Sequence, residues 1–166
     1  MEMFLVNART GFLGLADEKL PYVVPLNFVY YNRAIYIHGA AHGRKIDIIG
    51  RNSNACFTVS EDLGTLTDPV PAKTDTSYMS VMLFGHIQIV TDLNEATSAM
   101  QEMLNKYVPG YYHSPLSKSH VEKYRSSLGS RTAVLKLVPE SISAKLNEVN
   151  EAAKFYPGKT ALDKSR

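Results

Sequence analysis

Two adjacent cations, Arg44 and Lys45, stand at the end of the stretch HGAAHGRK (residues 38–45), where a strand-like pattern gives way to a helix-like one. Glycines let the backbone approach a ligand closely, and the start of a helix attracts anions. The stretch therefore predicts a phosphate site. Ile46 stands where a nucleotide-binding loop of the form GxxxxGK[ST] needs a hydroxyl, and the sequence has no GxGxxG, so a nucleoside triphosphatase is disfavoured. The alternative is that both cations are simply solvated at a helix start.

The histidines of this stretch do not predict a metal site. His38 and His42 straddle a glycine bend instead of sharing a helix face, and no carboxylate or cysteine lies close in sequence to complete a ligand set. His38 is either part of the predicted site or a strand histidine with ordinary hydrogen bonds. Cys56, the only cysteine, is most simply a buried apolar residue.

The first half of the chain alternates apolar and polar residues as β-strands do. Three strands are predicted in meander order, over residues 11–16, 20–31 and 34–39. Pro21 and Pro25 both fall in the second. Because proline cannot donate to a β-ladder, we expect that strand to lie at a sheet edge or to carry a bulge.

A short helix and two further strands follow. Ile46 and Ile49 recur at helical spacing and predict one helix after the glycine bend. A strand is expected over 55–60 and a longer one over 77–91, separated by a loop over 63–76 that is rich in proline, aspartate and threonine. The longer strand has apolar residues on both faces, so one face should meet the core and the other a second subunit or a ligand.

The second half predicts two helices and a last strand. Asp92 and Glu95 have the spacing of a capping box, which would open a helix that runs to about Tyr107. A second helix is predicted over 117–128 and a strand over 132–138. The aromatic residues near the second helix suit either a surface or the border of a substrate pocket: Tyr111, Tyr112, His113, Tyr124 and Arg125.

Composition limits the class of protein. With 166 residues, 45% of them hydrophobic, the chain suits a single domain, expected over 1–150 and followed by a polar, partly disordered tail over 151–166. The formal charge of +2 is dispersed, so nucleic-acid binding is not expected. No apolar run approaches the roughly 20 residues of a membrane span, and the single cysteine suits a reduced, cytoplasmic protein. The elements together predict a mainly β, antiparallel domain with two or three flanking helices.

Three blocks in order resemble the pyridoxamine 5′-phosphate oxidase-like split-barrel flavoproteins, and within them the nitroimidazole reductase branch. The blocks are PYVVPLNF from Pro21, YIHGAAHGRK from Tyr36 and YMSVMLFGH from Tyr78. The resemblance covers about residues 9–138. It implies a six-stranded antiparallel split β-barrel, a homodimer, and FMN in a cleft at or near the subunit interface.

The resemblance also implies roles for particular residues. Arg44 and Lys45 match the pair that holds the FMN phosphate, with Gly43 at the bend before them. His38 matches a histidine beside the flavin, where it would act as general acid or orient the substrate. The remaining cofactor-binding residues it implies lie on two strands: Pro25, Leu26, Asn27, Phe28, Ser80 and Val81.

One departure bears on the substrate. Family members that oxidise pyridoxamine phosphate carry further basic residues near the C-terminus, whereas ESISAKLNEVNEA contains no arginine cluster and only Arg131 lies nearby. Vitamin B6 oxidation is therefore not expected. The sequence predicts an FMN-dependent oxidoreductase that reduces small electron-poor organic compounds. The alternatives are a flavin carrier or redox sensor, a deazaflavin protein, and a haem protein with His38 or His86 as axial ligand.

Overall fold

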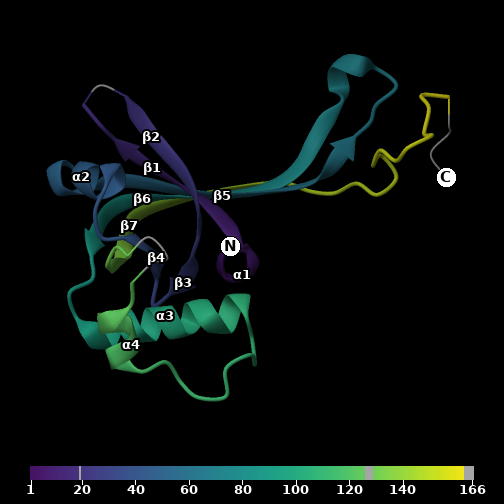
Figure 1. Cartoon of the computed structure of the whole chain (residues 1–166). Helices are drawn as coiled ribbons and strands as arrows, with labels where there is room; N and C mark the ends of the chain where they lie inside the picture. Colours follow the sequence, from purple (N-terminus) through teal and green to yellow (C-terminus); the bar gives the residue numbers. More distant parts are fainter. Residues whose placement is uncertain (19, 126–128, 163–166) are drawn as a thin grey trace.

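Seven antiparallel strands form one sheet in the part of the chain that the structure, a computed structural model, describes: residues 1–18, 20–125 and 129–162 (Figure 1). The sheet order is β2-β1-β5-β6-β7-β4-β3. Contacts between β2 and β4, near opposite ends of this order, show that the sheet curls toward closure. The mainly β, split-barrel prediction is confirmed. The strands are β1 (Thr10–Ala16), β2 (Pro21–Asn27), β3 (Val29–Tyr31), β4 (Ala34–Ala40), β5 (Asn54–Leu66), β6 (Asp75–Ile89) and β7 (Thr132–Asn147).

The strand count is seven instead of the predicted six because the second predicted strand is interrupted at Phe28. The Phe28 N–H donates to the Tyr107 hydroxyl at 2.9 Å instead of to a neighbouring strand. This hydroxyl also lies within hydrogen-bond distance of the carbonyl oxygens of Phe28 and Arg9. The chain consequently leaves β2 and starts β3, which pairs with β4, so the three predicted strands do not form a continuous meander.

The prolines of β2 lie where the sequence predicts. β2 is an edge strand whose one ladder partner is β1. Pro21 pairs with Ala16 and Pro25 with Phe12. An edge position leaves one side of the strand without ladder bonds, and a residue without an N–H is tolerated there.

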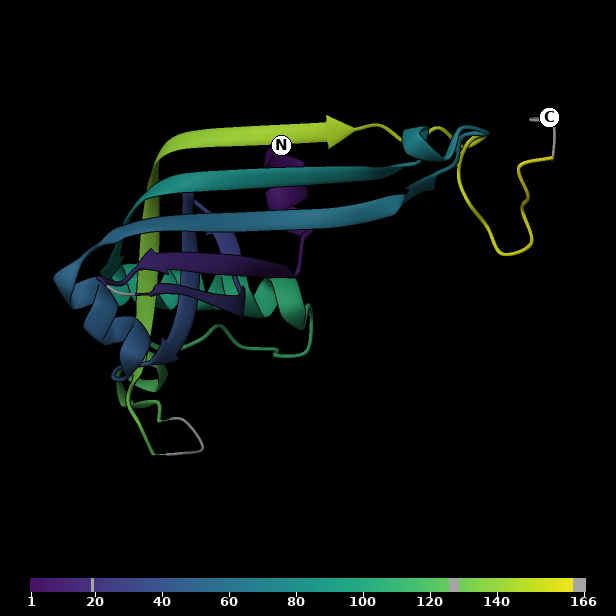
Figure 2. The same cartoon turned by 90° about the horizontal axis from the view of Figure 1, so that it is seen from above.

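The predicted loop over 63–76 is wrong in extent. β5 continues to Leu66 and β6 begins at Asp75, so the two strands form a long hairpin with a 3₁₀ turn (Pro71–Lys73) between them. Together with β7 this hairpin projects from the body of the molecule as an arm (Figure 2). The polar composition that suggested a loop is compatible with strands because the arm is exposed on much of its surface.

Four α-helices lie within the described residues, where two or three were predicted. The short α1 has no clear periodicity in the sequence, but it buries Leu5 completely. α4 is shorter than the predicted 117–128, and residues 126–128 of that prediction lie outside the described residues. The helices are α1 (Glu2–Asn7), α2 (Arg44–Arg51), α3 (Leu93–Tyr107) and α4 (Lys118–Lys123).

The alternation of β4 separates two apolar clusters. Ile35 and Ile37 face the interior of the curled sheet, where they join Phe28 and Phe57 among others. Tyr36 faces the other way and packs under α3. His38 is two residues further along the face of Tyr36, so β4 carries it toward the side of the sheet that α3 covers.

Glu95 does not close a capping box. Asp92 does cap α3, since its carboxylate accepts from the Asn94 N–H at 2.9 Å. Glu95 instead accepts hydrogen bonds from the Tyr36 hydroxyl and from Lys136 Nζ, both at 2.7 Å. The bonds from Lys136 and then Tyr36 lower the pKa of Glu95, while burial and the bond to Glu95 raise the pKa of Tyr36 to about 12. Glu95 thus ties α3 to β4 and β7.

Glu95→Gln should lower the melting temperature by roughly 2–8 °C, because a partly buried charge-assisted pair of bonds contributes about 1–2 kcal/mol. Since the folded pKa is lowered, this contribution is present above about pH 4.5 and is lost as the pH falls through the folded value. The difference in melting temperature between the two proteins should therefore stay constant from pH 7 to about pH 4.5 and shrink only at lower pH. Glu102→Gln is the control, because within the described residues Glu102, on the same helix, accepts from Asn105 alone, at 3.4 Å. An equal effect of both substitutions would contradict the assigned role.

The start of the predicted tail lies along the tip of the arm. The Phe155 N–H donates to the Thr65 carbonyl and the Thr67 N–H to the Ala153 carbonyl, both at 2.8 Å. Residues 163–166 of the predicted tail lie outside the described residues. None of the helices described is both long and apolar enough to cross a membrane.

Candidate functional site

The helix that was predicted to present a phosphate site begins as expected. Gly43 precedes α2 with φ of 107°, a conformation that residues with a side chain rarely adopt. The turn therefore needs glycine. Arg44 and Lys45 follow as the first two residues of the helix, and the close-range geometry of α2 decides what each cation can reach.

Lys45 folds back against β4. A Cβ atom on Gly39 would lie only 2.8 Å from Lys45 Nζ, so the missing side chain of Gly39 gives the ammonium its space. Burial lowers the pKa of Lys45. Among the described residues, no carboxylate forms an ion pair with this ammonium. A partly buried cation without an acidic partner is costly, and an anionic ligand would offset that cost.

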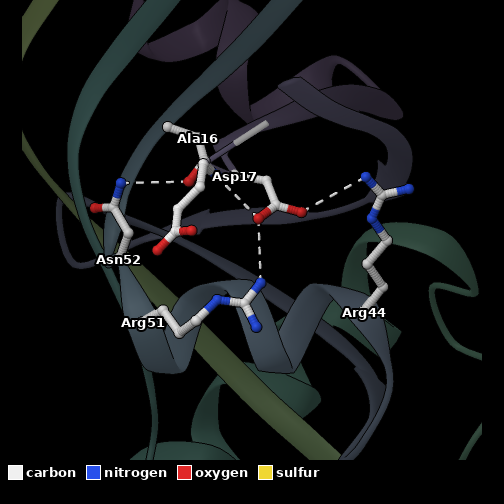
Figure 3. A network of polar contacts seen from close by, with 6 residues as sticks. Ala16, Asp17, Arg44, Arg51 and Asn52 are labelled. Atoms are coloured by element: carbon white, nitrogen blue, oxygen red, sulfur yellow. Dashed lines mark hydrogen bonds and ion pairs between the residues drawn. The ribbon is translucent and has the colours of Figure 1, made fainter. Parts of the chain in front are cut away.

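Arg44 reaches the opposite way, toward the β1–β2 turn (Figure 3). Its Nη2 atom lies 3.6 Å from Asp17 Oδ2, and its Cζ atom lies 5.2 Å from the centre of the Tyr22 ring. Arg51, from the last turn of α2, reaches the same carboxylate at 3.1 Å. The Arg44 side chain remains 54% exposed. Exposed ion pairs contribute at most about 1 kcal/mol, so a phosphate could compete with Asp17 for this guanidinium.

His38 lies beside Lys45. Its Nδ1 atom is buried and has no hydrogen-bond partner in the part of the chain that is described. Burial, and then the positive charge of Lys45, lower the pKa of His38. The imidazole is therefore neutral at pH 7. Within the described residues, His38 Nδ1 has no hydrogen-bond partner and the nearby Lys45 ammonium has no acidic partner. A strand histidine with ordinary hydrogen bonds would not be in this environment.

The predicted residues of β2 divide between two surroundings. Leu26 packs against the core, and Phe28 is completely buried against the Phe57 ring. Pro25 and Asn27 alternate with them and are exposed. Any contact of Phe28 with a cofactor would have to use its backbone, whereas Asn27 has its side chain free to take part.

Ser80 and Val81 lie on β6, toward the arm. Val81 is completely buried in the core, and Ser80 is on the opposite face of the strand, where it pairs with Ser60 and Lys145. No hydrogen bond or ion pair given for the described residues connects either of them to Lys45 or His38. Within one chain, the structure brings His38 and Lys45 together and leaves Ser80 and Val81 apart from them.

A cavity of about 890 Å³ adjoins His38, on the side of the sheet that carries α3 and α4. Asn27 and His38 form part of its wall, and Tyr112, His113 and Tyr124 contribute from the loop and helix above. This favours the pocket-border interpretation of those aromatic residues. His120 also lines it and was not singled out in the sequence, because its position on a short, polar helix gives no pattern that points to a site.

The sequence matches the family model of pyridoxamine 5′-phosphate oxidase over residues 1–146. The chain belongs to this family. It is a family of flavin-binding oxidoreductases. No curated protein matches the sequence.

Solved structures agree with the pyridoxamine 5′-phosphate oxidase family assignment. A structure named as a 5-nitroimidazole antibiotic resistance protein from Bacteroides thetaiotaomicron is 26% identical, with a TM-score of 0.67, 86% of this chain covered and 80% of that chain. The flavocytochrome Anf3 from Azotobacter vinelandii has a TM-score of 0.74 at 21% identity, over 89% of this chain and 65% of that chain. The FAD and heme binding protein from Mycobacterium smegmatis has a TM-score of 0.70 at 17% identity, over 88% and 69%. The last two, below 25% identity, show a shared fold alone.

Lys45→Met should stabilise the protein when no ligand is bound. Removing a partly buried, unpaired charge while keeping its aliphatic stem should contribute about 1 kcal/mol, or roughly 2–4 °C in melting temperature. Lys136→Met is the control with the opposite sign, because Lys136 is paired with Glu95 at 2.7 Å. Thermal melts without cofactor measure both. A lower melting temperature for Lys45→Met would show that the ammonium has a stabilising partner.

Proposed function

We propose that this protein is an FMN-dependent oxidoreductase that reduces small electron-poor organic compounds. The observation that carries the proposal is a pair of adjacent cations at a helix start that requires glycine: Lys45 is partly buried and has no acidic partner among the described residues, and Arg44 is exposed. These residues fit a phosphate dianion. Family membership supports a flavin as the molecule that bears it.

Different residues of this chain would bind the phosphate, contact the ring and supply the proton. Lys45 and Arg44 would neutralise the phosphate, one as a compact charge and the other as a planar fork. Asn27 and the exposed side of β2 would meet the polar edge of the ring. His38 would hold or donate a proton at the acceptor, since its Nδ1 atom has no hydrogen-bond partner among the described residues. When bound, FMN would supply the redox chemistry, taking a hydride from a donor such as a reduced nicotinamide and passing electrons to the acceptor.

The visible spectrum of the purified protein tests this proposal. We expect flavin bands, or their appearance when FMN is added to protein stripped of cofactor. Turnover of a nitroaromatic with a nicotinamide donor should follow. Absence of both flavin bands and FMN binding would contradict the proposal. A reduced, flavin-loaded protein that a nitroaromatic does not reoxidise would instead indicate a carrier or redox sensor.

We further propose a homodimer whose flavin cleft lies at or near the subunit interface. Along β7, Val134 pairs with His38, whereas Lys145, eleven positions later, pairs with Ser80. About 36 Å of strand at about 3.3 Å per residue separates the two pairs, and β7 bends between them (Figure 2). A second copy that supplies one of the two groups would let a single flavin contact both. The arm also exposes apolar side chains suited to such a contact, among them Phe84, Ile142 and Leu146.

Ile142→Glu combined with Leu146→Glu should convert the dimer into a monomer. The two side chains are 39% and 57% exposed in one chain, and placing four carboxylates in a symmetric interface would be strongly unfavourable. Light scattering after gel filtration measures the mass. Leu20→Glu is the control, because Leu20 is 62% exposed on the β1–β2 turn, away from the arm. A wild-type protein that runs as a monomer would rule out the dimer.

Haem is a second candidate, because two solved structures of similar fold are named as a flavocytochrome and as a FAD and heme binding protein. His38 lines the cavity together with His113 and His120. His86 is less suited, because it contacts Ser53 Oγ at 3.2 Å and Glu140 at 3.2 Å. A Soret band on haem titration that His38→Ala abolishes, and His86→Ala does not, would support haem. No Soret shift in the wild type would exclude it.

A further inference from the structure

The cavity between α3, α4 and the sheet is formed by one chain and has a distinct chemical character. Its floor includes His38 of β4 and Val134 of β7, and α3 and α4 form its roof. Its volume of about 890 Å³ is within the range of small-molecule sites. Apolar and aromatic side chains dominate the wall, among them Met100, Met103 and Leu104 of α3 and Tyr112, Val121 and Tyr124.

None of the described residues that line this cavity is an aspartate, glutamate, lysine or arginine. Its ionisable side chains are the tyrosines and the histidines, and His38 is held neutral at pH 7 by burial and by the charge of Lys45. Burying a charged ligand without an opposite charge costs several kcal/mol. Arg44 and Lys45, which could neutralise an anion, are not among the lining residues.

The polar groups of the wall come from the strands, from the loop before α4 and from α4 itself. Asn27 and His38 come from the strands, and the buried Nδ1 atom of His38 has no partner in the described residues. The methionines of α3 can adapt to differently shaped rings, and the tyrosines offer ring faces and edges. The wall therefore suits a flat, mainly apolar molecule.

We propose that this cavity is the acceptor-binding chamber, and that it takes uncharged planar aromatic compounds while it excludes carboxylated and phosphorylated ones. That the bound compound is an electron acceptor rests on the proposed function. The preference for uncharged aromatic compounds rests on the residues that line the cavity. Lys45 and Arg44 serve the cofactor phosphate and cannot at the same time hold a phosphorylated substrate. Pyridoxamine 5′-phosphate is accordingly among the compounds excluded.

Isothermal titration of the oxidised, FMN-loaded protein with a matched series tests the chamber without turnover. 4-Nitrobenzyl alcohol, 4-nitrobenzoate and 4-nitrophenyl phosphate share one ring and differ in charge. We expect the alcohol to bind at least about tenfold more tightly than either anion, because no lysine or arginine among the described residues lines the chamber. Equal or tighter binding of an anion would overturn the assignment.

Two variants locate the binding. Leu104→Trp and Met100→Trp each place a larger side chain in the cavity and should weaken binding of the alcohol at least about tenfold. Val70→Trp, at the tip of the arm and 49% exposed, is the control and should leave it unchanged. Thermal melts identify any variant that fails to fold. If one cavity variant does not fold, the binding measured with the other variant tests the assignment. Unchanged binding in a folded cavity variant would overturn the chamber, as would a His38-dependent Soret band on haem titration.

The same titration on protein without FMN separates this inference from the proposed function. The wall of the chamber belongs to the protein, so the alcohol should still bind. Binding of the alcohol by a protein that does not bind FMN would refute the proposed function and leave a chamber for uncharged aromatics. Binding of FMN without binding of the alcohol would refute the chamber alone.

Discussion

Replacing Arg44 and Lys45 together by glutamine is expected to weaken FMN binding about 100- to 1,000-fold. Lys45 has no acidic partner in the described residues, and Arg44, whose side chain is 54% exposed, lies 3.6 Å from Asp17, so both can turn to a phosphate. Two charge-assisted contacts to a dianion contribute about 3–4 kcal/mol together, which corresponds to that range. Fluorescence quenching of added FMN measures the affinity.

Arg51→Gln provides a closely matched control. Arg51 lies on the same helix and reaches the same Asp17 carboxylate, but from the last turn of α2 instead of the first. The substitution removes the same kind of charge about ten ångströms along the helix axis, at about 1.5 Å per residue. We expect a change in FMN affinity below about threefold. A loss as large as that of the double variant would mean that the general charge of α2, and not the predicted pair, attracts the cofactor.

His38→Ala should lower kcat for reduction of a nitroaromatic by about 100-fold, in the range typical of a lost proton donor or acceptor. FMN affinity should change far less, because the predicted phosphate contacts are intact. The pKa of His38 lies below its ordinary value of 6.5, so the protonated form accumulates only as the pH falls below that value. If His38 supplies the proton, wild-type activity should rise as the pH falls below 6.5 and be flat above pH 7. The variant should lose this rise.

His38→Gln separates the two roles that were predicted for this residue. Glutamine can hydrogen-bond a substrate but cannot carry a proton to it. Recovery of kcat in His38→Gln would indicate that His38 orients the substrate, and continued loss would indicate that it donates a proton. His86→Gln, on β6 and outside the lining of the cavity, is the control and should retain activity. Full activity of His38→Ala would remove His38 from the reaction.

Local patterns were sufficient for much of the fold. The prolines of residues 20–31 predicted an edge strand or a bulge, and β2 is an edge strand. Ile46 and Ile49 predicted the short helix that the structure has as α2, with Ile48 and Ile49 buried. These elements follow from short-range rules, namely the missing N–H of proline and the 3.6-residue period of a helix.

The errors come from contacts between residues far apart in sequence. Phe28 leaves the sheet because its N–H donates to Tyr107, which is 79 residues away. Glu95 has the spacing of a capping box but instead bonds Tyr36 and Lys136. The loop predicted over 63–76 is largely strand, because pairing along β5 and β6 satisfies its backbone in spite of its polar side chains. No local pattern contains these partners.

The candidate site also combines features that local sequence patterns predict with features that depend on contacts between distant residues. The order of glycine, arginine and lysine at a helix start could be found in the sequence. That Lys45 folds into the space left by Gly39, beside a buried Nδ1 atom of His38, could not, because it depends on how α2 packs on β4. The cavity is likewise assembled from segments as distant as Asn27, Leu104 and Val134.

The affinity of FMN compared with that of riboflavin is the most direct test of the claim that Arg44 and Lys45 hold the cofactor phosphate. Riboflavin has the same ring and ribityl chain without the phosphate. We expect the wild type to prefer FMN by about 100-fold or more, and the Arg44→Gln/Lys45→Gln variant to bind both with the affinity that the wild type has for riboflavin. A variant that keeps the wild-type preference for FMN would place the phosphate elsewhere and contradict the proposed site.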